Sequence, residues 1–549
     1  MWEPYAWGMC RPLTRRELMR YGALVAATFP AARLLDDAFM LAERAYAQAP
    51  AFPMNLELVT VSDTVAVMTW FTGDPGDPDE FGRPRPAAAP GRVLLGSDPD
   101  PTTWEVYGEH GPTAYHYVEI HGLDPGTTYY WRAESAGVPA TPTASVQLPA
   151  GELPAPVAFT TLVPPPGREL GTVVWMNDLH FGEMTSGLAI GNSSLPGGGF
   201  PPGFAVDPDN PYWRFMAAAG VAESRGRGAR VLFANGDVTG SPEPESIVAA
   251  KSVLGTFGQL GSTVGDAPHY FVTRGNHDRG HSGAAYEGCS AVPGRPDLRD
   301  CFSDAFAASF EPGTQHFSVT VGDDKARFRF VGLDSSDIET GTGVVPDDEI
   351  DYLQAQLGRD DATFVLCHHM VSDIATTLAV PPVSFGVEQV SAAKMRAVLG
   401  AHDNVAAVYN GHTHRNHRTI ATDTASLPYF EGGATKEYPG GYTTVRLFEG
   451  GYMVNFWKAH TGDALAWSER SRGEYLGLYP YYTLGGLTHR NWVREIDSRR
   501  VSTPRPPGGA GGPGGNRPGG LPATGQGALM NAAAAALTGA ALTARSALR

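Results

Sequence analysis

The chain has 549 residues but only four cysteines, and it carries no excess of positive charge. Its 41 lysines and arginines stand against 58 aspartates and glutamates, which gives a formal net charge of −17. This balance argues against a surface that binds nucleic acid and favours an acidic exterior. Long hydrophobic runs are also missing, so we expect no stable membrane span in the mature protein.

The few cysteines leave two interpretations open. Cys289 and Cys301 bracket a short loop that contains Gly and Pro, and they could pair outside the cytosol or remain two free thiols. Cys367 lies in an apolar strand, where a small core residue is more common than a reactive thiol. The cysteines therefore agree weakly with export and indicate no thiol chemistry.

Residues 1–49 have the features of an export signal. The segment TRRELMR at Thr14–Arg20 resembles the twin-arginine pattern, and a weakly apolar run and small-residue cleavage sites near Ala47 follow it. The resemblance implies passage through the twin-arginine translocase. The alternative is a cytosolic amphipathic helix with a chance arginine pair.

The other end of the chain predicts anchoring. Residues 501–520 are mostly Pro and Gly and should form a spacer without a core. Leu521–Gly525, LPATG, then resembles the LPxTG signal that sortase cleaves in Gram-positive bacteria, and residues 521–549 would form this sorting signal. We expect a secreted protein that is anchored to the cell wall. A low-complexity tail with a chance match is the alternative.

Residues 50–163 predict a small all-β sandwich. Two strands around a Ser62–Asp63 turn, further strands at 92–96, 115–120 and 127–133, and the lack of helical periodicity support this. The segments TWF (69–71), GLDPGTTYY (122–130) and FTT (159–161) resemble the fibronectin-III-like domain at the front of purple acid phosphatases. No group of metal-binding or nucleophilic residues occurs here.

Residues 164–500 alternate between strands and helices. We expect helices at 211–226, 245–260, 350–357 and 391–399. Five apolar strands, at 173–176, 231–234, 270–273, 364–367 and 405–409, each lead directly into a polar cluster. Because open α/β sheets bind ligands at the carboxyl ends of their strands, the five clusters should converge on one site.

The side chains in these clusters are those that bind metals. They include Asp178, His180, Asp237, Asn276, His368, His369, His412 and His414, with no cysteine. Imidazole and carboxylate ligands suit Zn, Mn and Fe. Their number exceeds the needs of one tetrahedral ion and fits two ions bridged by one carboxylate. Such cations would also reverse the acidic local field and permit a phosphate substrate.

The order of the clusters carries a family resemblance. Asp178-x-His180, Gly236-Asp237, Gly275-Asn276-His277-Asp278, His368-His369 and Gly411-His412-Thr413-His414 look like the five blocks of calcineurin-like metallophosphoesterases, over about residues 172–460. The resemblance implies an α/β fold, a two-sheet metallophosphoesterase sandwich flanked by helices. It also implies hydrolysis of phosphomonoesters or phosphodiesters by a metal-bound hydroxide.

The resemblance further implies ligand roles for two divalent or mixed-valence ions of Fe, Mn or Zn. The first ion would be held by Asp178, His180 and His414, and Asp237 would bridge to the second. Asn276, His368 and His412 would complete the second position. His369 would lie behind the ligands, unless the roles of His368 and His369 are reversed.

His277 and Asp278 would be catalytic. His277 would protonate the leaving oxygen or contact the phosphoryl group, and Asp278 would fix its tautomer and raise its basicity. The chain departs from purple acid phosphatases in two places. His180 stands where they carry Gly, and no Tyr follows Gly236-Asp237, so no Fe(III)–phenolate colour is expected.

Several further expectations follow from the same region. Arg279 and His281 could meet a substrate phosphate or be solvated, and Asp334 should be structural. The Gly-, Pro- and Ser-rich insertion at 183–209 should lie over the site. Strands at 442–448 and 452–457 should belong to a second β layer. The rival to an enzyme is a non-catalytic cell-surface binding protein whose metal site is structural.

Overall fold

The computed structural model of the protein describes residues 51–78, 84–142, 154–186, 205–261, 267–279, 290–292, 295–300, 302–311, 315–338, 341–371, 387, 389–421, 424, 426–472 and 480–498. By its contacts the chain divides into residues 1–148 with 153–500 and residues 149–152 with 501–549, and every described residue belongs to the first unit. The expected export signal, the spacer, the sorting signal and the Cys289–Cys301 pair lie outside the described residues. No helix among the described residues is both long and apolar enough to cross a membrane.

The first part of the described chain is an all-β sandwich, as expected. One sheet contains β1 (Phe52–Val61), β2 (Val65–Pro78), β3 (Pro84–Pro86) and β6 (Tyr115–His121). The other contains β4 (Ala89–Gly96), β5 (Glu105–Thr113), β7 (Thr128–Ser135), β8 (Val138–Pro139) and β9 (Ala158–Thr160), and η1 (Pro101–Thr103) lies between β4 and β5. Leu58, Trp70, Val93 and Trp131 pack between the sheets. Strand β5 was not expected, because its two glycines and one proline are typical of a turn.

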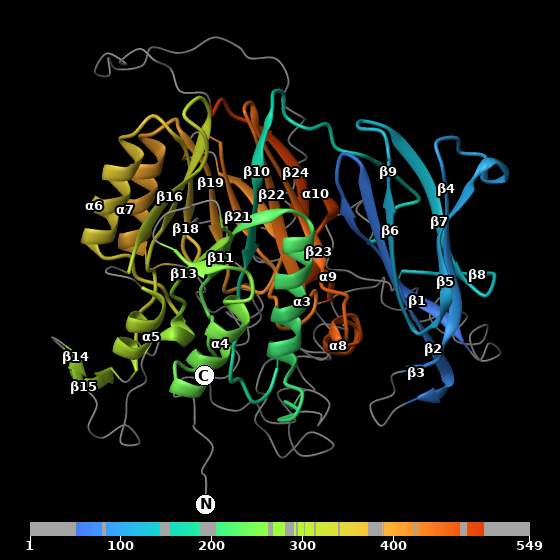
Figure 1. Ribbon diagram of the computed structural model, residues 1–549, viewed down its shortest axis with the longest axis horizontal. Helices are drawn as coiled ribbons and strands as arrows, with labels where there is room; N and C mark the ends of the chain where they lie inside the picture. Colours follow the sequence, from blue (N-terminus) through green and yellow to red (C-terminus); the bar gives the residue numbers. More distant parts are fainter. Residues whose placement is uncertain are drawn as a thin grey trace, which may run out of the picture. The chain divides into compact units, whose positions relative to one another are not determined.

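The rest of the described chain contains two larger sheets (Figure 1). The first has seven strands in the order β12 (Gln259–Leu260), β13 (His269–Thr273), β11 (Ala229–Asn235), β10 (Glu169–Met176), β22 (Gly441–Phe448), β23 (Gly451–Lys458) and β24 (Asn491–Glu495). The second has six, in the order β16 (Phe317–Gly322), β17 (Arg327–Gly332), β18 (Ala362–Leu366), β19 (Val405–Asn410), β21 (Leu427–Glu431) and β20 (His417–Ala421). Within each sheet, the strands that lead into the polar clusters run parallel to one another.

The two sheets pack face to face, with helices outside them. The aromatic rings of Trp175, Phe233, Phe330 and Phe364 fill the space between the sheets. Alternate residues of β10, such as Val174 and Met176, face the opposite way, because side chains alternate along a strand. They pack against α3 (Tyr212–Gly226) and α4 (Pro244–Leu254). The α/β two-sheet sandwich flanked by helices that the sequence predicted is therefore confirmed.

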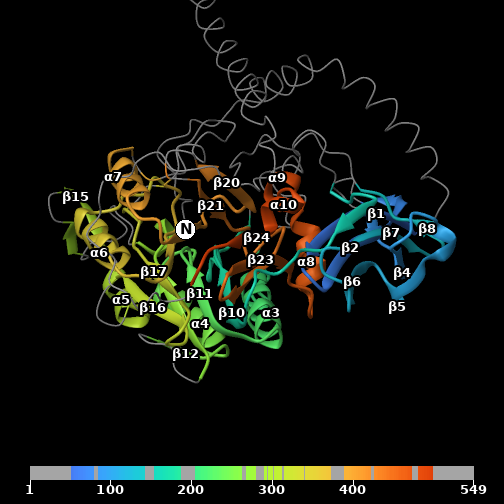
Figure 2. The same ribbon diagram turned by 90° about the horizontal axis from the view of Figure 1, so that it is seen from above.

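The outer face of the six-stranded sheet is covered by α6 (Asp347–Leu357) and α7 (Gln389–Gly400). Figure 2 shows these two helices on one side of the sandwich and α3 and α4 on the other. The shorter elements are η3 (Asn276–Asp278), the hairpin β14 (Ser290–Val292) and β15 (Arg295–Asp300), α5 (Ser303–Phe310), α8 (Ala464–Ser471), α9 (Pro480–Leu484) and α10 (Leu487–Arg490).

Two expectations about elements were wrong. The segment 441–458 forms β22 and β23, but β22 pairs antiparallel with β10 and so belongs to the sheet of the first three clusters. The helix expected at 245–260 ends at Leu254, because Gly255 and Gly258 interrupt it and β12 begins at Gln259.

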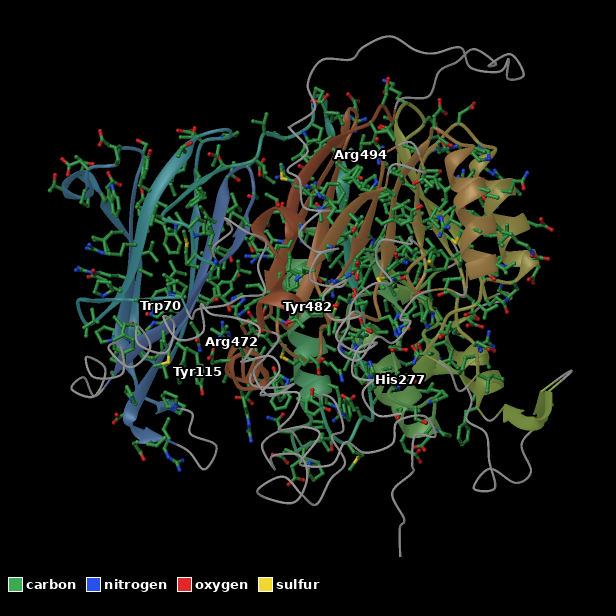
Figure 3. All side chains as sticks on the ribbon, turned by 180° about the vertical axis from the view of Figure 1, so that it is seen from behind. Trp70, Tyr115, His277, Arg472, Tyr482 and Arg494 are labelled. Atoms are coloured by element: carbon green, nitrogen blue, oxygen red, sulfur yellow. The ribbon has the colours of Figure 1, made fainter. Side chains whose placement is uncertain are left out.

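A buried ion cluster connects the β-sandwich with the two-sheet region. The carboxylate of Glu57 in β1 accepts hydrogen bonds from the Lys458 ammonium at 2.6 Å and the Tyr438 hydroxyl at 2.6 Å. Arg472, labelled in Figure 3, lies 3.3 Å from the same carboxylate. Burial alone would raise the pKa of Glu57, but Lys458 and Arg472 outweigh it and lower the pKa to about 2. Glu57 is therefore ionised at neutral pH.

Candidate metal centre

The five polar clusters come together where the two sheets end. Each cluster starts within two residues of the end of β10, β11, β13, β18 or β19. The first three strands belong to the seven-stranded sheet and the other two to the six-stranded sheet. The site is therefore shared between the two packed sheets of the sandwich.

The first group of ligand atoms comes from Asp178, His180 and His414, whose candidate atoms all lie within 4.8 Å of one another. The Nε2 nitrogen of His414 is 3.3 Å from an Asp178 carboxylate oxygen. Asp178 is fully buried and also accepts hydrogen bonds from the Asn177 amide at 2.7 Å and the His412 backbone N–H at 3.2 Å. Burial would raise the pKa of Asp178, but His414 outweighs it and lowers the pKa to about 2.

The second group comes from Asp237, His368 and His412, again within 4.8 Å. The Nδ1 nitrogen of His368 is 3.0 Å from the carbonyl oxygen of Asn235, which can only accept, so Nδ1 carries a proton. This bond turns the Nε2 nitrogen of His368 toward Asp237, at 3.0 Å. Burial would lower the pKa of His368, but Asp237 outweighs it and raises the pKa to about 9.

Asp237 lies between the two groups. Its Oδ2 oxygen is 3.0 Å from the Nε2 nitrogen of His368 and 3.5 Å from that of His180. Its other oxygen accepts a hydrogen bond of 2.8 Å from the His277 backbone N–H. One carboxylate oxygen thus faces imidazoles of both groups, which is the geometry that a bridging ligand requires.

Two glycines allow the loops to approach this closely. A Cβ atom on Gly236 would lie 2.4 Å from the Nδ1 nitrogen of His368, and Gly236 has a φ of +83°. A Cβ atom on Gly275 would lie 2.1 Å from a carboxylate oxygen of Asp237. Both positions therefore require glycine for the strand-end loops to keep their contacts.

The backbone of the site is strained. Nine residues other than glycine have a positive φ within the described residues, and five of them are candidate ligands: Asp178, His180, Asp237, His412 and His414. Such a conformation costs on the order of 1–3 kcal/mol for each residue. The surrounding structure therefore holds these side chains in place against the preference of their own backbone.

Several buried polar atoms have no hydrogen bond. At this site, within the described residues, they include the Oδ1 oxygen of Asn276, the Nε2 nitrogen of His368 and both ring nitrogens of His180. Carboxylate oxygens lie 3.0–3.5 Å from these three nitrogens but not in the geometry of a hydrogen bond. Buried polar groups are normally hydrogen-bonded, and ring nitrogens and an amide oxygen that lack such bonds around two carboxylates fit cation ligands. These ligand atoms therefore fit metal ions, and the Asn276 oxygen without a hydrogen bond lies in the cluster where the second ion was expected.

The surroundings of His277 differ from the expectation. Its Nδ1 nitrogen is 3.0 Å from the Gly240 carbonyl oxygen. The Asp278 carboxylate instead accepts hydrogen bonds of 2.8–3.0 Å from the backbone N–H groups of Val238, Thr239 and Gly275 and from the Thr239 hydroxyl. The idea that Asp278 fixes the tautomer of His277 was therefore wrong, because backbone donors occupy its oxygens. Burial, followed by the charge of Asp237, raises the pKa of Asp278 to about 6.

His277 also lies beside two of the candidate ligands. It forms a third group with His180 and Asp237, within 4.8 Å, and its ring centroid is 4.5 Å from that of His180. Figure 3 labels His277. The ring can thus reach a ligand or a substrate held at the first position.

His369 lies outside the three groups that the described residues form. Its Nδ1 nitrogen is 3.0 Å from the Ser335 hydroxyl, and that hydroxyl also accepts from the His369 backbone N–H. Cys367 is fully buried, and burial raises the pKa of its thiol to about 12. Both residues thus occupy supporting positions next to His368.

Arg279 is committed to an ion pair. Its guanidinium donates to Asp334 at 2.6 Å and to the Ser336 hydroxyl at 2.9 Å. The pair links the loop after β13 to the loop after β17, which gives Asp334 the structural position expected for it. His281 and residues 187–204 of the insertion lie outside the described residues.

Sequence reasoning missed the residues behind the candidate ligands. Glu437 lies 2.6 Å from His414, Glu183 lies 3.4 Å from His180, and Lys436 lies 2.6 Å from Glu183. From the sequence, Glu183 was named only as the first residue of the insertion. Lys436 and Glu437 belong to none of the five motif blocks and were not named. The acidic residue three positions after His180 was the one signal available.

No family model and no curated protein matches the chain. Similar solved structures include a dimetal phosphatase from Danio rerio, with 12% identity and a TM-score of 0.36 over 53% of this chain and 98% of that one. A structure of PhoD has 12% identity and a TM-score of 0.32, over 76% of this chain and 89% of that one. A purple acid phosphatase from yellow lupin seeds has 13% identity and a TM-score of 0.34, over 76% and 74%. These similarities are distant.

Proposed function

We propose that the protein is a metal-dependent hydrolase of phosphate esters. The observation that carries the proposal is the position of Asp237, one of whose carboxylate oxygens faces His180 of the first group and His368 of the second. Two ligand groups joined by one carboxylate form the arrangement used for phosphoester hydrolysis. The sequence motifs that resemble calcineurin-like metallophosphoesterases supply these residues.

Asp178, His180 and His414 would hold one ion, and Asn276, His368 and His412 the other, with Asp237 between them. When bound, two such ions supply positive charge for the phosphoryl oxygens and lower the pKa of water toward neutrality. The ligand set of nitrogen and oxygen atoms suits Fe, Mn or Zn. Val238 and Thr239 follow Asp237 where a tyrosine would be needed for a coloured iron site.

His277 is the group placed to move a proton. The Gly240 carbonyl holds its Nδ1 proton, so Nε2 is the nitrogen that can give a proton to a leaving oxygen. Asp278 supports the loop and does not support this proton transfer directly, because its oxygens accept from backbone N–H groups. We assign His277 to the chemistry and Asp278 to the position of the loop that carries it.

The proposal includes export. The arginine pair at Arg15–Arg16 and the LPATG segment at Leu521–Gly525 motivate a secreted enzyme handled by the twin-arginine translocase and by sortase. A phosphate ester outside the cell would then be the substrate. The acidic net charge gives no reason to expect a nucleic acid partner.

The rival function is a non-catalytic surface protein with a structural metal site. A structural site needs no proton donor beside its ligands, so the position of His277 next to His180 and Asp237 favours the enzyme. The deciding experiment is turnover of a chromogenic phosphate ester by the purified protein, with and without a chelator. Metal content is measured on the same sample, and phosphomonoesters, phosphodiesters and nucleotides are compared. A protein that holds two ions but hydrolyses none of these esters would instead be the non-catalytic surface protein.

A further inference from the structure

Behind the first group, two carboxylates support two histidines. The Nδ1 nitrogen of His414 is 2.6 Å from an oxygen of Glu437. The Nδ1 nitrogen of His180 is 3.4 Å from an oxygen of Glu183. A carboxylate in this position orients a ligating imidazole and increases its basicity. Each histidine of the first group therefore has its own carboxylate on the side away from Asp178 and Asp237.

A single lysine joins these two carboxylates. The Lys436 ammonium is 2.6 Å from both oxygens of Glu183 and 3.4 Å from an oxygen of Glu437. Its side chain is only 3% exposed, so its charge must be paired inside the protein. The two carboxylates cannot shift independently, because each is tied to the same buried cation.

Other side chains hold the carboxylates from the outside. The Tyr212 hydroxyl donates to Glu183 at 2.7 Å, and the Ser186 hydroxyl donates to Glu437 at 2.7 Å. The indole N–H of Trp467 donates to the Lys436 carbonyl oxygen at 2.7 Å. Residues from the loop after β10, from α3 and from α8 thus fix one network of charges.

The second group is supported differently. The Nδ1 nitrogen of His368 meets a backbone carbonyl, that of Asn235, and Asn276 offers a neutral amide oxygen. A carbonyl oxygen carries less negative charge than a carboxylate and increases the basicity of an imidazole less. The two positions are therefore chemically unequal even though both share Asp237.

We propose that Glu183 and Glu437, joined by Lys436, make the first group the tighter of the two metal positions. The carboxylates keep His180 and His414 oriented, and Lys436 acts as a positioning residue that ties the two supports together. This inference rests on the proposed two-metal function. It assigns an order to the ions: the first position keeps its ion when the second has exchanged.

The test is a titration of metal-free protein with Zn²⁺ against a chromogenic chelator, which reads affinity and stoichiometry without any turnover. The unaltered protein should bind two ions with different affinities. Glu437→Gln and Glu183→Gln should each lower the higher affinity by about 10- to 100-fold, the usual effect of losing such a support. The lower affinity should change by less than about threefold, because His368 and Asn276 are not touched.

The double variant tests the lysine. Each single variant leaves Lys436 with one of these two carboxylates, but the double variant removes both, so a buried positive charge near the ion loses their compensation. Its loss of affinity should therefore exceed the product of the two single losses. Glu57→Gln is the matched control, since it removes another buried carboxylate paired with a lysine, one that contacts Lys458, Tyr438 and Arg472 and none of the imidazole ligands among the described residues. It should leave both zinc affinities unchanged.

The outcomes separate this inference from the function on which it rests. Folded single variants that keep both wild-type affinities, or that lose both equally, would overturn the inference while leaving a two-metal hydrolase intact. A double variant equal to the product of the singles would remove the role of Lys436 alone. Unaltered protein that binds fewer than two ions would overturn the proposed function as well. Thermal unfolding of each metal-free variant shows whether it is folded.

Discussion

The Nδ1 nitrogen of His277 lies 3.0 Å from the carbonyl oxygen of Gly240. A carbonyl oxygen accepts and never donates, so this contact fixes the proton on Nδ1 and leaves Nε2 to exchange one. The histidine can therefore act as an acid when its ring is doubly protonated. Its orientation comes from the backbone of the second block rather than from the neighbouring Asp278.

His277→Asn should keep both metals and lose about 10²–10⁴-fold in rate, the usual contribution of a general acid. The loss should be largest for alkyl esters and small for nitrophenyl esters, because a good leaving group departs with little need of a proton. Rates over a series of leaving groups check this. Equal losses across the series would mean that His277 positions the phosphoryl group instead.

Asp278→Asn is the companion variant. Its carboxylate accepts from Val238, Thr239 and Gly275, so the change should lower thermal stability but leave the dependence on leaving group as in the unaltered protein. A changed dependence of the rate on the leaving group would indicate that Asp278 acts on His277 directly.

Asp237→Asn should weaken both metal positions and reduce hydrolysis by more than about tenfold, because the oxygen that faces both groups would lose its charge. Metal analysis and turnover of a phosphate ester are the measurements. Asp361→Asn is the control. Asp361 is as buried as Asp237 and pairs with Arg327 and Arg329. It lies at the start of β18, and His368 follows the other end of that strand. Two ions and full activity in Asp237→Asn would contradict the bridging role.

Gly236→Ala should destabilise the protein by at least about 1–3 kcal/mol, since alanine would have to adopt a left-handed backbone. The added Cβ would also press on the His368 ring, so metal binding should weaken. Gly226→Ala, at the end of α3, meets no atom within 4 Å and should be neutral or slightly stabilising. Thermal unfolding and zinc titration of both variants decide whether the close approach at Gly236 matters.

Glu57→Gln should lower the free energy of unfolding at neutral pH by about 3–5 kcal/mol, because Lys458 and Arg472 would stay buried after losing the charge of this carboxylate. The pKa of Glu57 falls from an ordinary 4.5 to about 2 on folding, so its stabilisation is present above 4.5 and is lost as pH falls toward 2. The difference between Glu57→Gln and the unaltered protein should therefore shrink below pH 4.5. Denaturant unfolding at several pH values measures it.

A contrast comes from the exposed pair of Asp77 and Arg85, whose side chains are 67% and 52% exposed. Asp77→Asn should change stability by less than about 1 kcal/mol at any of these pH values, because water screens such pairs. A difference for Glu57→Gln that does not vary with pH would show that Glu57 is not ionised in the folded protein.

Replacing Arg15 and Arg16 by lysine should stop export through the twin-arginine route, and deleting Leu521–Gly525 should move the protein from the wall fraction to the medium. Fractionation of cells that express each variant is the measurement, with the unaltered chain as reference. An unchanged distribution of both variants would remove the proposal of an anchored enzyme.

The sequence was informative where chemistry and strand periodicity coincide. Apolar strands followed by Asp, Asn and His located the ends of β10, β11, β13, β18 and β19, because buried strands and metal ligands both restrict residue type. The pairing of β22 with β10 could not be predicted. Buried strands have similar residue types in both sheets, so the sequence does not show which sheet a strand joins. The short strand β12 was hidden by an apolar run that also fits a helix.

The supporting residues of the site were beyond sequence reasoning for a different reason. Lys436 and Glu183 are separated by more than two hundred and fifty positions and meet only because β22 folds back beside β10. Asp278 was assigned to His277 because the two are adjacent in sequence. The backbone N–H groups that occupy its carboxylate carry no residue-specific signal, so no sequence pattern could have shown them.

The positive φ of five candidate ligand residues has a consequence for how this site can evolve. Glycine would adopt the backbone of Asp178, His180, Asp237, His412 or His414 at lower cost, so a substitution there can raise stability while it removes a ligand. Selection for higher stability alone would thus favour substitutions at the metal centre that remove ligands. Regaining the ligands would require several strained residues to reappear together. We therefore expect a descendant protein that has lost this metal centre to keep the fold and rarely to regain the ligands.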